Sequence, residues 1–211
     1  MRSYAEYCAI AKSLDVVGDR WTLLIVRELA LRGPCRYTDL RHGLPGIATN
    51  LLAERLRELE RAGVVAREDA PPPVATTLFH LTPRGRELRP VLDELLRWGI
   101  PLMTEQDPGD AVRSHWLAGA VEVMLTDREP DGAPVTLELQ TGDRPIVMQT
   151  SRGRVQARLG PAEAPDAVLA GPPNPILGLL LGLMELADAR AAGVDYRGDP
   201  ALLGRFAASV S

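Results

Sequence analysis

Apolar residues in the first hundred positions recur mostly at helical spacing, and short glycine and proline breaks separate the runs. The pattern predicts a helix from Asp19, which can cap it, to about Leu31, where Gly33 and Pro34 end it. Its apolar face consists of Trp21, Leu24, Ile25 and Leu29. We therefore expect a mainly helical N-terminal half.

A tight turn joins two further predicted helices. The first is short and covers 37–42, the turn covers 44–47, and the second helix covers 49–62 and stops at Gly63. One face of the longer helix carries Leu52, Leu56 and Leu59. Two helices joined by a short turn that contains glycine form a helix-turn-helix unit.

A hairpin follows the second helix directly, which is the arrangement of a wing. Its strands are predicted over 64–67 and 76–81, with a proline-rich tip between them. Thr82 then caps a helix with Pro83 at its first position, and Pro90 is expected to bend that helix. These elements predict a winged helix-turn-helix domain over 1–105.

The second half alternates apolar and polar residues at the strand period. The three strand-like runs are VTLELQT (135–141), PIVMQTS (145–151) and RVQARLG (154–160). A helix over 111–125 precedes them, and a strand over 165–171, a helix from 174, a short strand over 194–199 and a helix from Pro200 follow. The order predicts an α+β layer domain over 111–211. The segment 105–110 is the expected boundary.

The composition excludes several classes of protein. Two cysteines cannot build a disulfide framework or a four-thiolate zinc site, and three scattered histidines do not suit a metal centre, so no metal and no cofactor are expected. There is no signal peptide, and the stretch 176–186 is too short to span a bilayer. No catalytic or nucleotide-binding motif is found, so we expect a cytoplasmic protein that is not an enzyme.

The net charge of −4 disfavours a polyanionic partner, but the charge is unevenly distributed. Residues 1–105 hold 15 basic and 14 acidic side chains, residues 106–211 hold 9 and 14, and the segment 32–67 has seven arginines against four acids. Nucleic-acid binding needs a local basic surface and not a basic chain. A solvated helix surface with ion pairs is the alternative that charge alone favours.

The outward face of the helix over 49–62 has the side chains that a recognition helix needs. Its first residues are small and polar, asparagine can pair with adenine, and arginine can pair with guanine. The residues predicted to contact DNA in the grooves are Thr49, Asn50, Ala53, Arg57 and Arg61, together with Tyr37. Those predicted to contact phosphates are Arg36, Arg41, Arg67, Thr76 and Thr77. The alternative is a helical bundle with a solvated polar face, which the order of the elements disfavours.

Several motifs of this half carry a resemblance to a known family. They are Leu14-Asp15-Val16-Val17-Gly18-Asp19-Arg20-Trp21-Thr22, Tyr37-Thr38-Asp39-Leu40, Leu44-Pro45-Gly46-Ile47, Arg55-Leu56-Arg57-Glu58-Leu59-Glu60 and Leu81-Thr82-Pro83-Arg84-Gly85. Over about 5–104 the chain resembles the HxlR family of bacterial transcription regulators. The resemblance implies a homodimer on a double-stranded DNA operator, each subunit placing one recognition helix in a major groove.

The same resemblance implies that the first and last helices, about 5–16 and 83–104, form the dimer. Apolar residues that suit this role are Leu88, Leu92, Leu95 and Leu96, although they could also pack within one subunit. The chain departs from the family at Ala48, where a serine usually caps the recognition helix. Thr49 could cap it one residue later, which would leave Asn50 as the leading base reader.

The segments 166–171 and 193–199 resemble the sterol carrier protein domain. This resemblance implies an apolar tunnel between sheet and helices for a hydrophobic small molecule. The candidate lining residues are Trp116, Met124, Leu137, Leu139, Ile146, Met148, Leu177, Leu181, Met184 and Phe206, each of which could equally be ordinary core. Glu122, Glu138 and Glu185 are either surface residues or polar anchors in such a pocket.

Cys8 stands where redox sensors of the resembled family carry a reactive cysteine. Lys12, Arg20 or a helix N-terminus could lower its pKa, and the alternative is a small apolar residue in a dimer interface. Cys35 follows Gly33-Pro34 in a predicted loop and is expected to be incidental.

The main hypothesis is a transcription regulator, expected to be a repressor, that a hydrophobic molecule in the C-terminal domain controls. The first alternative is a redox regulator acting through Cys8, with a purely structural C-terminal domain. The second is a lipid carrier that has lost DNA binding, which a missing salt dependence of DNA binding would reveal.

Overall fold

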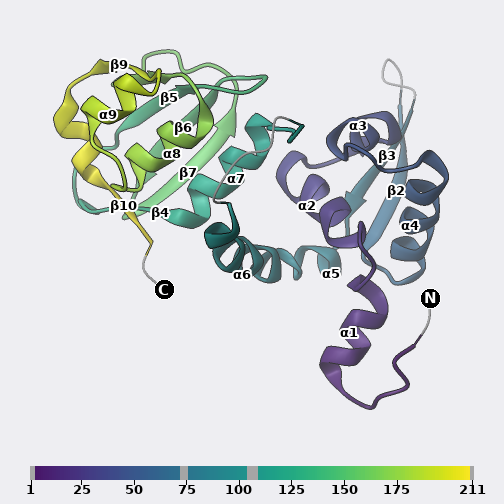
Figure 1. Cartoon of the computed structure of the whole chain (residues 1–211). Helices are drawn as coiled ribbons and strands as arrows, with labels where there is room; N and C mark the ends of the chain where they lie inside the picture. Colours follow the sequence, from purple (N-terminus) through teal and green to yellow (C-terminus); the bar gives the residue numbers. More distant parts are fainter. Residues whose placement is uncertain (1–2, 72–75, 104–108, 210–211) are drawn as a thin grey trace. The chain divides into compact units, whose positions relative to one another are not determined.

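The computed structural model describes residues 3–71, 76–103 and 109–209. The chain divides into two compact units, Met1–Leu102 and Met103–Ser211 (Figure 1). No helix of the described residues is both long enough and apolar enough to cross a membrane.

The first unit is a set of helices around a small antiparallel sheet. The helices are α1 (Ala9–Val17), α2 (Thr22–Arg32), α3 (Tyr37–Gly43), α4 (Thr49–Arg61), α5 (Pro83–Arg86), α6 (Arg89–Gly99) and the 3-10 turn η1 (Ile100–Leu102). The strands are β1 (Cys35–Arg36), β2 (Val65–Ala70) and β3 (Thr76–Leu81), in the order β1-β3-β2. This is a helix-turn-helix, α3 and α4, followed by a winged hairpin, β2 and β3.

One hydrophobic core holds this unit together. Leu52, Leu56 and Leu59 of α4 are at most 2% exposed and pack with residues of α2, α3 and the hairpin. The predicted apolar face of the helix over 49–62 is therefore the buried one. Gly63 follows at φ +70°, a backbone conformation that favours glycine and lets the chain turn into the hairpin.

The ends of three elements differ from the sequence prediction. α2 begins at Thr22, because Asp19 accepts a hydrogen bond from Arg55 and caps no helix. Ala48, and not Thr49, is the N-cap of α4, and no side chain caps this helix.

The predicted helix after the wing is two helices. Thr82 caps α5 as expected, since its Oγ1 accepts a hydrogen bond from the Gly85 amide at 3.0 Å. α6 then starts anew with Pro90 in its first turn, because proline has no amide hydrogen to continue a helix. Cys35, expected in a loop, lies in β1 opposite Phe79.

The second unit contains a seven-stranded sheet in the order β10-β4-β7-β6-β5-β8-β9. The strands are β4 (Leu125–Asp127), β5 (Thr136–Gln140), β6 (Ile146–Ser151), β7 (Arg154–Leu159), β8 (Ala167–Ala170), β9 (Asp195–Gly198) and β10 (Phe206–Ala208). β5 and β8 are parallel and the other neighbours antiparallel. The helices are α7 (Ser114–Met124), α8 (Pro173–Leu180), α9 (Leu186–Ala191) and the 3-10 helix η2 (Pro200–Arg205).

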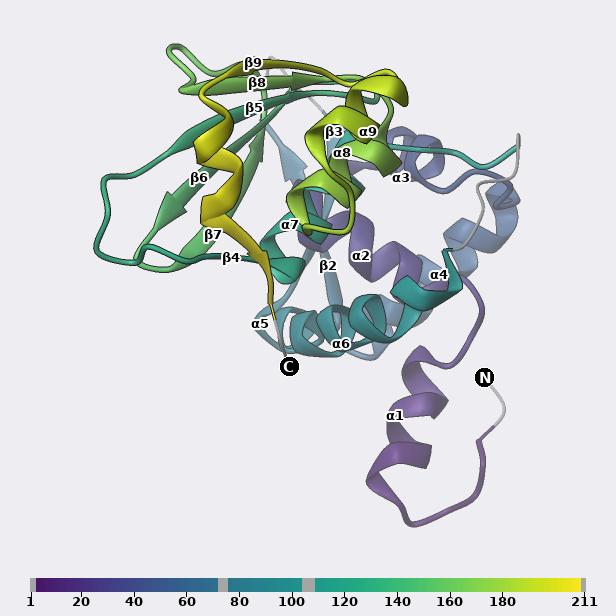
Figure 2. The same ribbon diagram turned by 60° about the vertical axis from the view of Figure 1, so that its left-hand side comes forward.

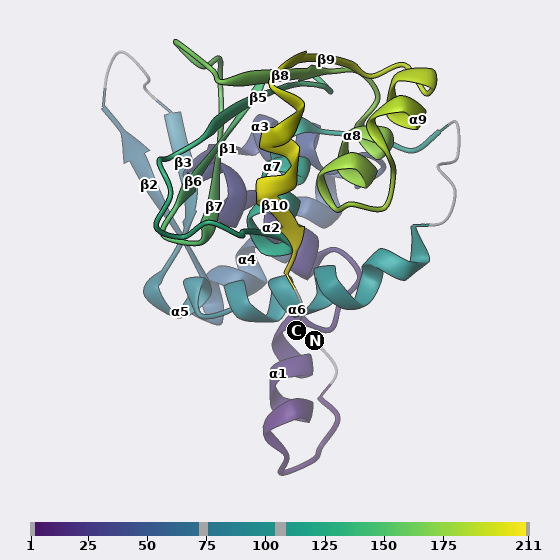
Figure 3. The ribbon, with the colours of Figure 1, turned by 90° about the vertical axis from the view of Figure 1, so that its left-hand side faces the viewer.

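The core of this unit lies between one face of the sheet and the helices α7 and α8. Alternate strand residues such as Leu137, Leu139 and Met148 are fully buried against Val121 of α7 and Ile176 of α8. Figure 2 shows both helices beside the curled sheet, and Figure 3 shows η2 running from β9 to β10.

The sequence did not predict β4, β10 and α9. The first two are three-residue strands that pair with each other, and β4 also pairs with β7. Their conformation is set by these partners more than by local pattern. The helix from residue 174 ends at Leu180, because Gly182 at φ +70° breaks the leucine-rich run before α9.

Candidate nucleic-acid interface

The face of α4 opposite the core collects most of the predicted base-reading residues. Thr49, Asn50, Arg57 and Arg61 are exposed and Ala53 is half-buried. Because the leucines of the same helix are buried on the other side, this face is open to a groove of DNA. A 13-residue helix has the length of a recognition helix.

Tyr37 anchors the first turn of α4. The hydroxyl of this half-buried tyrosine donates a hydrogen bond to the Thr49 carbonyl at 2.5 Å. Tyr37 thus joins α3 to the start of α4. This contact fixes the end of the helix at which Asn50 stands.

The two arginines of the α4 face are folded back along their own helix. Arg57 Nε donates to the Ala53 carbonyl at 3.2 Å, and Arg61 Nε donates to the Arg57 carbonyl at 3.3 Å. Each guanidinium has five N–H donors, so the remaining ones can reach a base or a phosphate.

The α3 helix adds two more basic side chains. Arg36 and Arg41 are exposed, and the Arg36 amide donates to the Asp39 carboxylate at 3.1 Å. This contact closes the first turn of α3. Both arginines are accessible to phosphates.

The wing differs from a simple basic hairpin. Arg67 Nε lies 3.2 Å from a Glu60 carboxylate oxygen, and the Thr77 hydroxyl donates to Asp69 at 2.8 Å. Glu68 and Asp69 are exposed beside them, and Thr76 is half-buried. Two of the three predicted phosphate contacts of the wing are therefore engaged by carboxylates.

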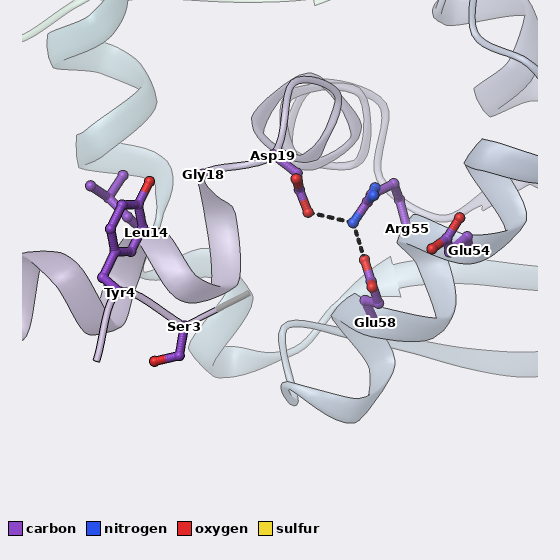
Figure 4. A pocket seen from close by; sticks show the side chains of 8 residues that line it. All are labelled: Ser3, Tyr4, Leu14, Gly18, Asp19, Glu54, Arg55 and Glu58. Carbon is purple, nitrogen blue, oxygen red and sulfur yellow. Dashed lines mark hydrogen bonds and ion pairs between the residues drawn. The ribbon is translucent and has the colours of Figure 1, made fainter. Parts of the chain in front are cut away.

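Sequence reasoning missed Arg55. Its Nη1 donates to Asp19, in the connection between α1 and α2, and to Glu58, one turn further along α4 (Figure 4). Position 55 falls at the edge of the apolar face, three residues after Leu52. That spacing was the available signal, since a charged residue there faces a packed neighbour and not solvent.

The two cysteines have opposite environments. Cys8 is the exposed N-cap of α1, and the backbone N–H groups of Ala11 and Ile10 lower the pKa of its thiol. Cys35 is buried, and desolvation raises the pKa of its thiol to about 11. Only Cys8 therefore combines exposure with thiolate character.

Most residues predicted to line a ligand cavity in the second unit belong to its core. Leu137, Leu139, Ile146, Met148 and Phe206 are at most 3% exposed. Leu177, Leu181 and Met184 are half-buried against that core, and Trp116 and Met124 are half-buried on α7. The structure brings the first eight together.

The three carboxylates of this unit have separate places. Glu138 is 7% exposed and accepts hydrogen bonds from the Gln140 side chain at 2.7 Å and the Ala162 amide at 2.6 Å, which lower its pKa. Glu122 accepts a bond from the Ala157 amide at 2.9 Å, and Glu185 is exposed. Glu138 thus fastens the segment after β7 to β5.

Comparison with known proteins gives a consistent set of relatives. A family model described as HxlR-like helix-turn-helix matches residues 16–107. The uncharacterized HTH-type transcriptional regulator YvaP of Bacillus subtilis (strain 168) is 38% identical over 95 residues, which are 44% of this chain and 87% of that protein. The HTH-type transcriptional regulator YodB of the same organism is 33% identical over 100 residues, 47% of this chain and 86% of that protein. A solved structure of reduced YodB is 31% identical, covers 48% of this chain and 100% of that chain, and has a TM-score of 0.41.

Proposed function

The chain belongs to the HxlR-like helix-turn-helix family, and we propose that this transcriptional regulator of the helix-turn-helix type binds an operator as a homodimer. In this proposal α4 enters the major groove, a hydrophobic small molecule binds the second unit, and the regulator acts as a repressor. The observation that carries the proposal is the exposed polar face of α4 over a buried leucine face.

Base reading is assigned to the exposed start of α4 and to Arg57. Asn50 and Arg57 are exposed residues of types that pair bidentately with adenine and guanine. Arg36 and Arg41 on α3 are assigned to phosphates, and the wing is assigned a smaller share because carboxylates engage Arg67 and Thr77.

A second copy of the chain fits the apolar side chains that α1 and α6 expose. Tyr7 and Ile10 at α1 are 108% and 72% exposed, and Trp98 on α6 is 72% exposed. Val91 and Leu95 share the Trp98 face at spacings of seven and three residues. Leu88 and Leu92, by contrast, pack against the core of their own unit. Exposed apolar residues in such number mark an association surface.

The second unit supplies the proposed effector site. Fully buried strand residues form its floor, and half-buried Leu177, Leu181 and Met184 form a layer above them. Leu183, which is 79% exposed, lies next to Gly182 in the same segment. We assign this segment as the part that moves when an apolar ligand enters, because methionine and loop residues repack readily.

The test of DNA reading is selection of duplexes from a random pool by the full chain. The affinity for the selected duplex is then measured against salt for wild type and Arg57→Gln. We expect a steep negative salt slope, about 0.9 per phosphate contacted. Arg57→Gln should weaken binding by about 1–3 kcal/mol if it reads a base. Selection of no duplex would overturn the proposal.

Effector control is tested with a fluorescent fatty-acid analogue. It should bind the wild-type chain, bind Leu181→Glu more weakly, and change the affinity for the selected duplex. A regulator that keeps its DNA affinity at saturation with the analogue would contradict control by such ligands, since allostery needs unequal affinity for the two states.

Redox control through Cys8 is a second candidate function, and the exposure and lowered pKa of its thiol favour it. In that case diamide should release wild type from the selected duplex and leave Cys8→Ser bound. An equal response of both proteins would exclude this candidate.

A further inference from the structure

Arg55 lies at the edge of the buried face of α4 and is committed to carboxylates. Its side chain is only 16% exposed, and Glu58 is only 10% exposed. The guanidinium holds Asp19 and Glu58 through one nitrogen (Figure 4). Because Glu54 also lines this hollow, a phosphate approaching Arg55 would meet three carboxylates.

The Asp19 partner belongs to the end of α1. It follows Gly18, the C-cap of that helix, and stands 36 residues before Arg55 in the chain. α1 itself packs lightly, since Ala11 and Val17 are its buried residues. In Figure 1, α1 stands away from the other helices of its unit.

A pocket of about 470 Å³ lies beside the ion pairs. Ser3, Tyr4, Leu14 and Gly18 line one side of it, and Glu54, Arg55 and Glu58 line the other (Figure 4). The N-terminal segment is held on its own side, because Asp15 accepts hydrogen bonds from the Ser3 hydroxyl and the Tyr4 amide at 2.8 Å each. At this pocket the Asp19–Arg55 contact spans from the α1 side to α4.

We propose that Arg55 is a positioning residue for DNA binding, which sets the orientation of α4 relative to the end of α1 and does not touch DNA. The inference rests on the proposed DNA-binding function and deepens it. Leucine contacts are non-directional and alone would let α4 rotate on its core. A charge-assisted pair with fixed geometry adds the missing direction, and partial burial reduces its screening by salt.

This link also gives α1 an influence on the recognition helix. Any displacement of the end of α1 reaches α4 through Asp19 before it reaches the leucine core. Whatever moves α1, a rearranged dimer or a modified Cys8, would then change DNA affinity. The coupling needs no contact between α1 and DNA.

The test uses the full chain and the duplex selected by wild type from a random pool. Asp19→Asn, Arg55→Gln and the double variant are compared, with Arg55→Lys as a charge-retaining variant and Arg41→Gln as the phosphate-contact control. Thermal unfolding shows that each variant is folded, and Asp19→Asn leaves α4 itself unchanged. We measure affinity as a function of salt for each protein.

We expect Asp19→Asn and Arg55→Gln each to weaken binding roughly tenfold, and the double variant to be no weaker than Arg55→Gln. Their salt slopes should equal that of wild type, whereas Arg41→Gln should lose about 0.9 from the slope. Arg55→Lys should be intermediate, because an ammonium cannot hold two carboxylates in one plane.

Three results would overturn the inference while leaving the proposed function intact. They are wild-type affinity in Asp19→Asn, additive losses in the double variant, and a reduced salt slope in Arg55→Gln, which would make Arg55 a phosphate contact. A wild-type chain that selects no duplex would overturn both the inference and the proposed function.

Discussion

Gly85 is the position at which one added methyl group should disturb the base of the wing. A Cβ at this residue of α5 would lie 2.1 Å from the Val64 carbonyl oxygen and 3.2 Å from Leu81 Cδ2. That oxygen accepts the Thr82 amide at 3.1 Å, and the Thr82 hydroxyl donates to the Gly63 carbonyl at 2.6 Å. Backbone cannot rotate away as a side chain can, so α5 must move off the strand.

The cost of Gly85→Ala follows from two terms of opposite sign. Overpacking costs about 1–3 kcal/mol, and the Thr82 bonds at risk are worth about 1 kcal/mol each. The better helix propensity of alanine returns about 1 kcal/mol. We expect a net loss of about 3 kcal/mol in the free energy of unfolding of the first unit, or a fall of roughly 10–20 °C in its Tm.

The assay is denaturant unfolding together with hydrogen exchange of the segment 63–88, which should lose protection. Gly99→Ala is the matched control, because this helical position has no atom within 4 Å of an added Cβ. The control should be neutral or more stable by up to about 1 kcal/mol. A Gly85→Ala protein within about 0.5 kcal/mol of wild type would refute the reasoning.

Three further outcomes are expected. In the folded protein at pH 8, iodoacetamide should label Cys8 and spare Cys35, whose pKa is about 11, and the Cys8 rate should fall only as pH drops through its lowered pKa; equal labelling would contradict this. Replacing both wing acids, Glu68→Gln with Asp69→Asn, should tighten binding to the selected duplex and steepen the salt slope by about 0.9 for each phosphate gained, and an unchanged slope would show that the wing stays clear of DNA. Glu138 has a lowered pKa in the folded state, so its contribution to stability is present above the ordinary glutamate pKa and is lost as pH falls through the folded value; Glu138→Gln should flatten that acid dependence, measured as the unfolding midpoint against pH.

Local chemistry made parts of the fold predictable. The leucine face of α4 and the Thr82-Pro83 start of α5 are set by side chains within one or two turns, so the sequence pattern locates them. Asp19 shows the limit of such reasoning. It has the chemistry of a helix cap, but its partner is Arg55, 36 residues away, and spacing along the chain carries no trace of that contact.

The candidate site shows the same division. The pattern of buried leucines indicates which residues of α4 point outward, because one helix face determines the other. It cannot show that Arg67 faces Glu60 or that Thr77 bonds Asp69, since strand register and hairpin placement decide these pairs. The two strands β4 and β10 were missed for a similar reason, as each is short and depends on its neighbour.

The distribution of charge on the first unit makes the orientation of α4 decisive. Phosphate contacts supply affinity for any sequence, and the wing of this protein offers few of them, because carboxylates engage Arg67 and Thr77. More of the binding free energy must then come from α3 and α4, whose base contacts tolerate little misplacement. A small rotation of α4 costs such a regulator more than one held down by a basic wing. The ion pairs of Arg55 therefore lie where a modest change in contact free energy gives a large change in occupancy of the operator.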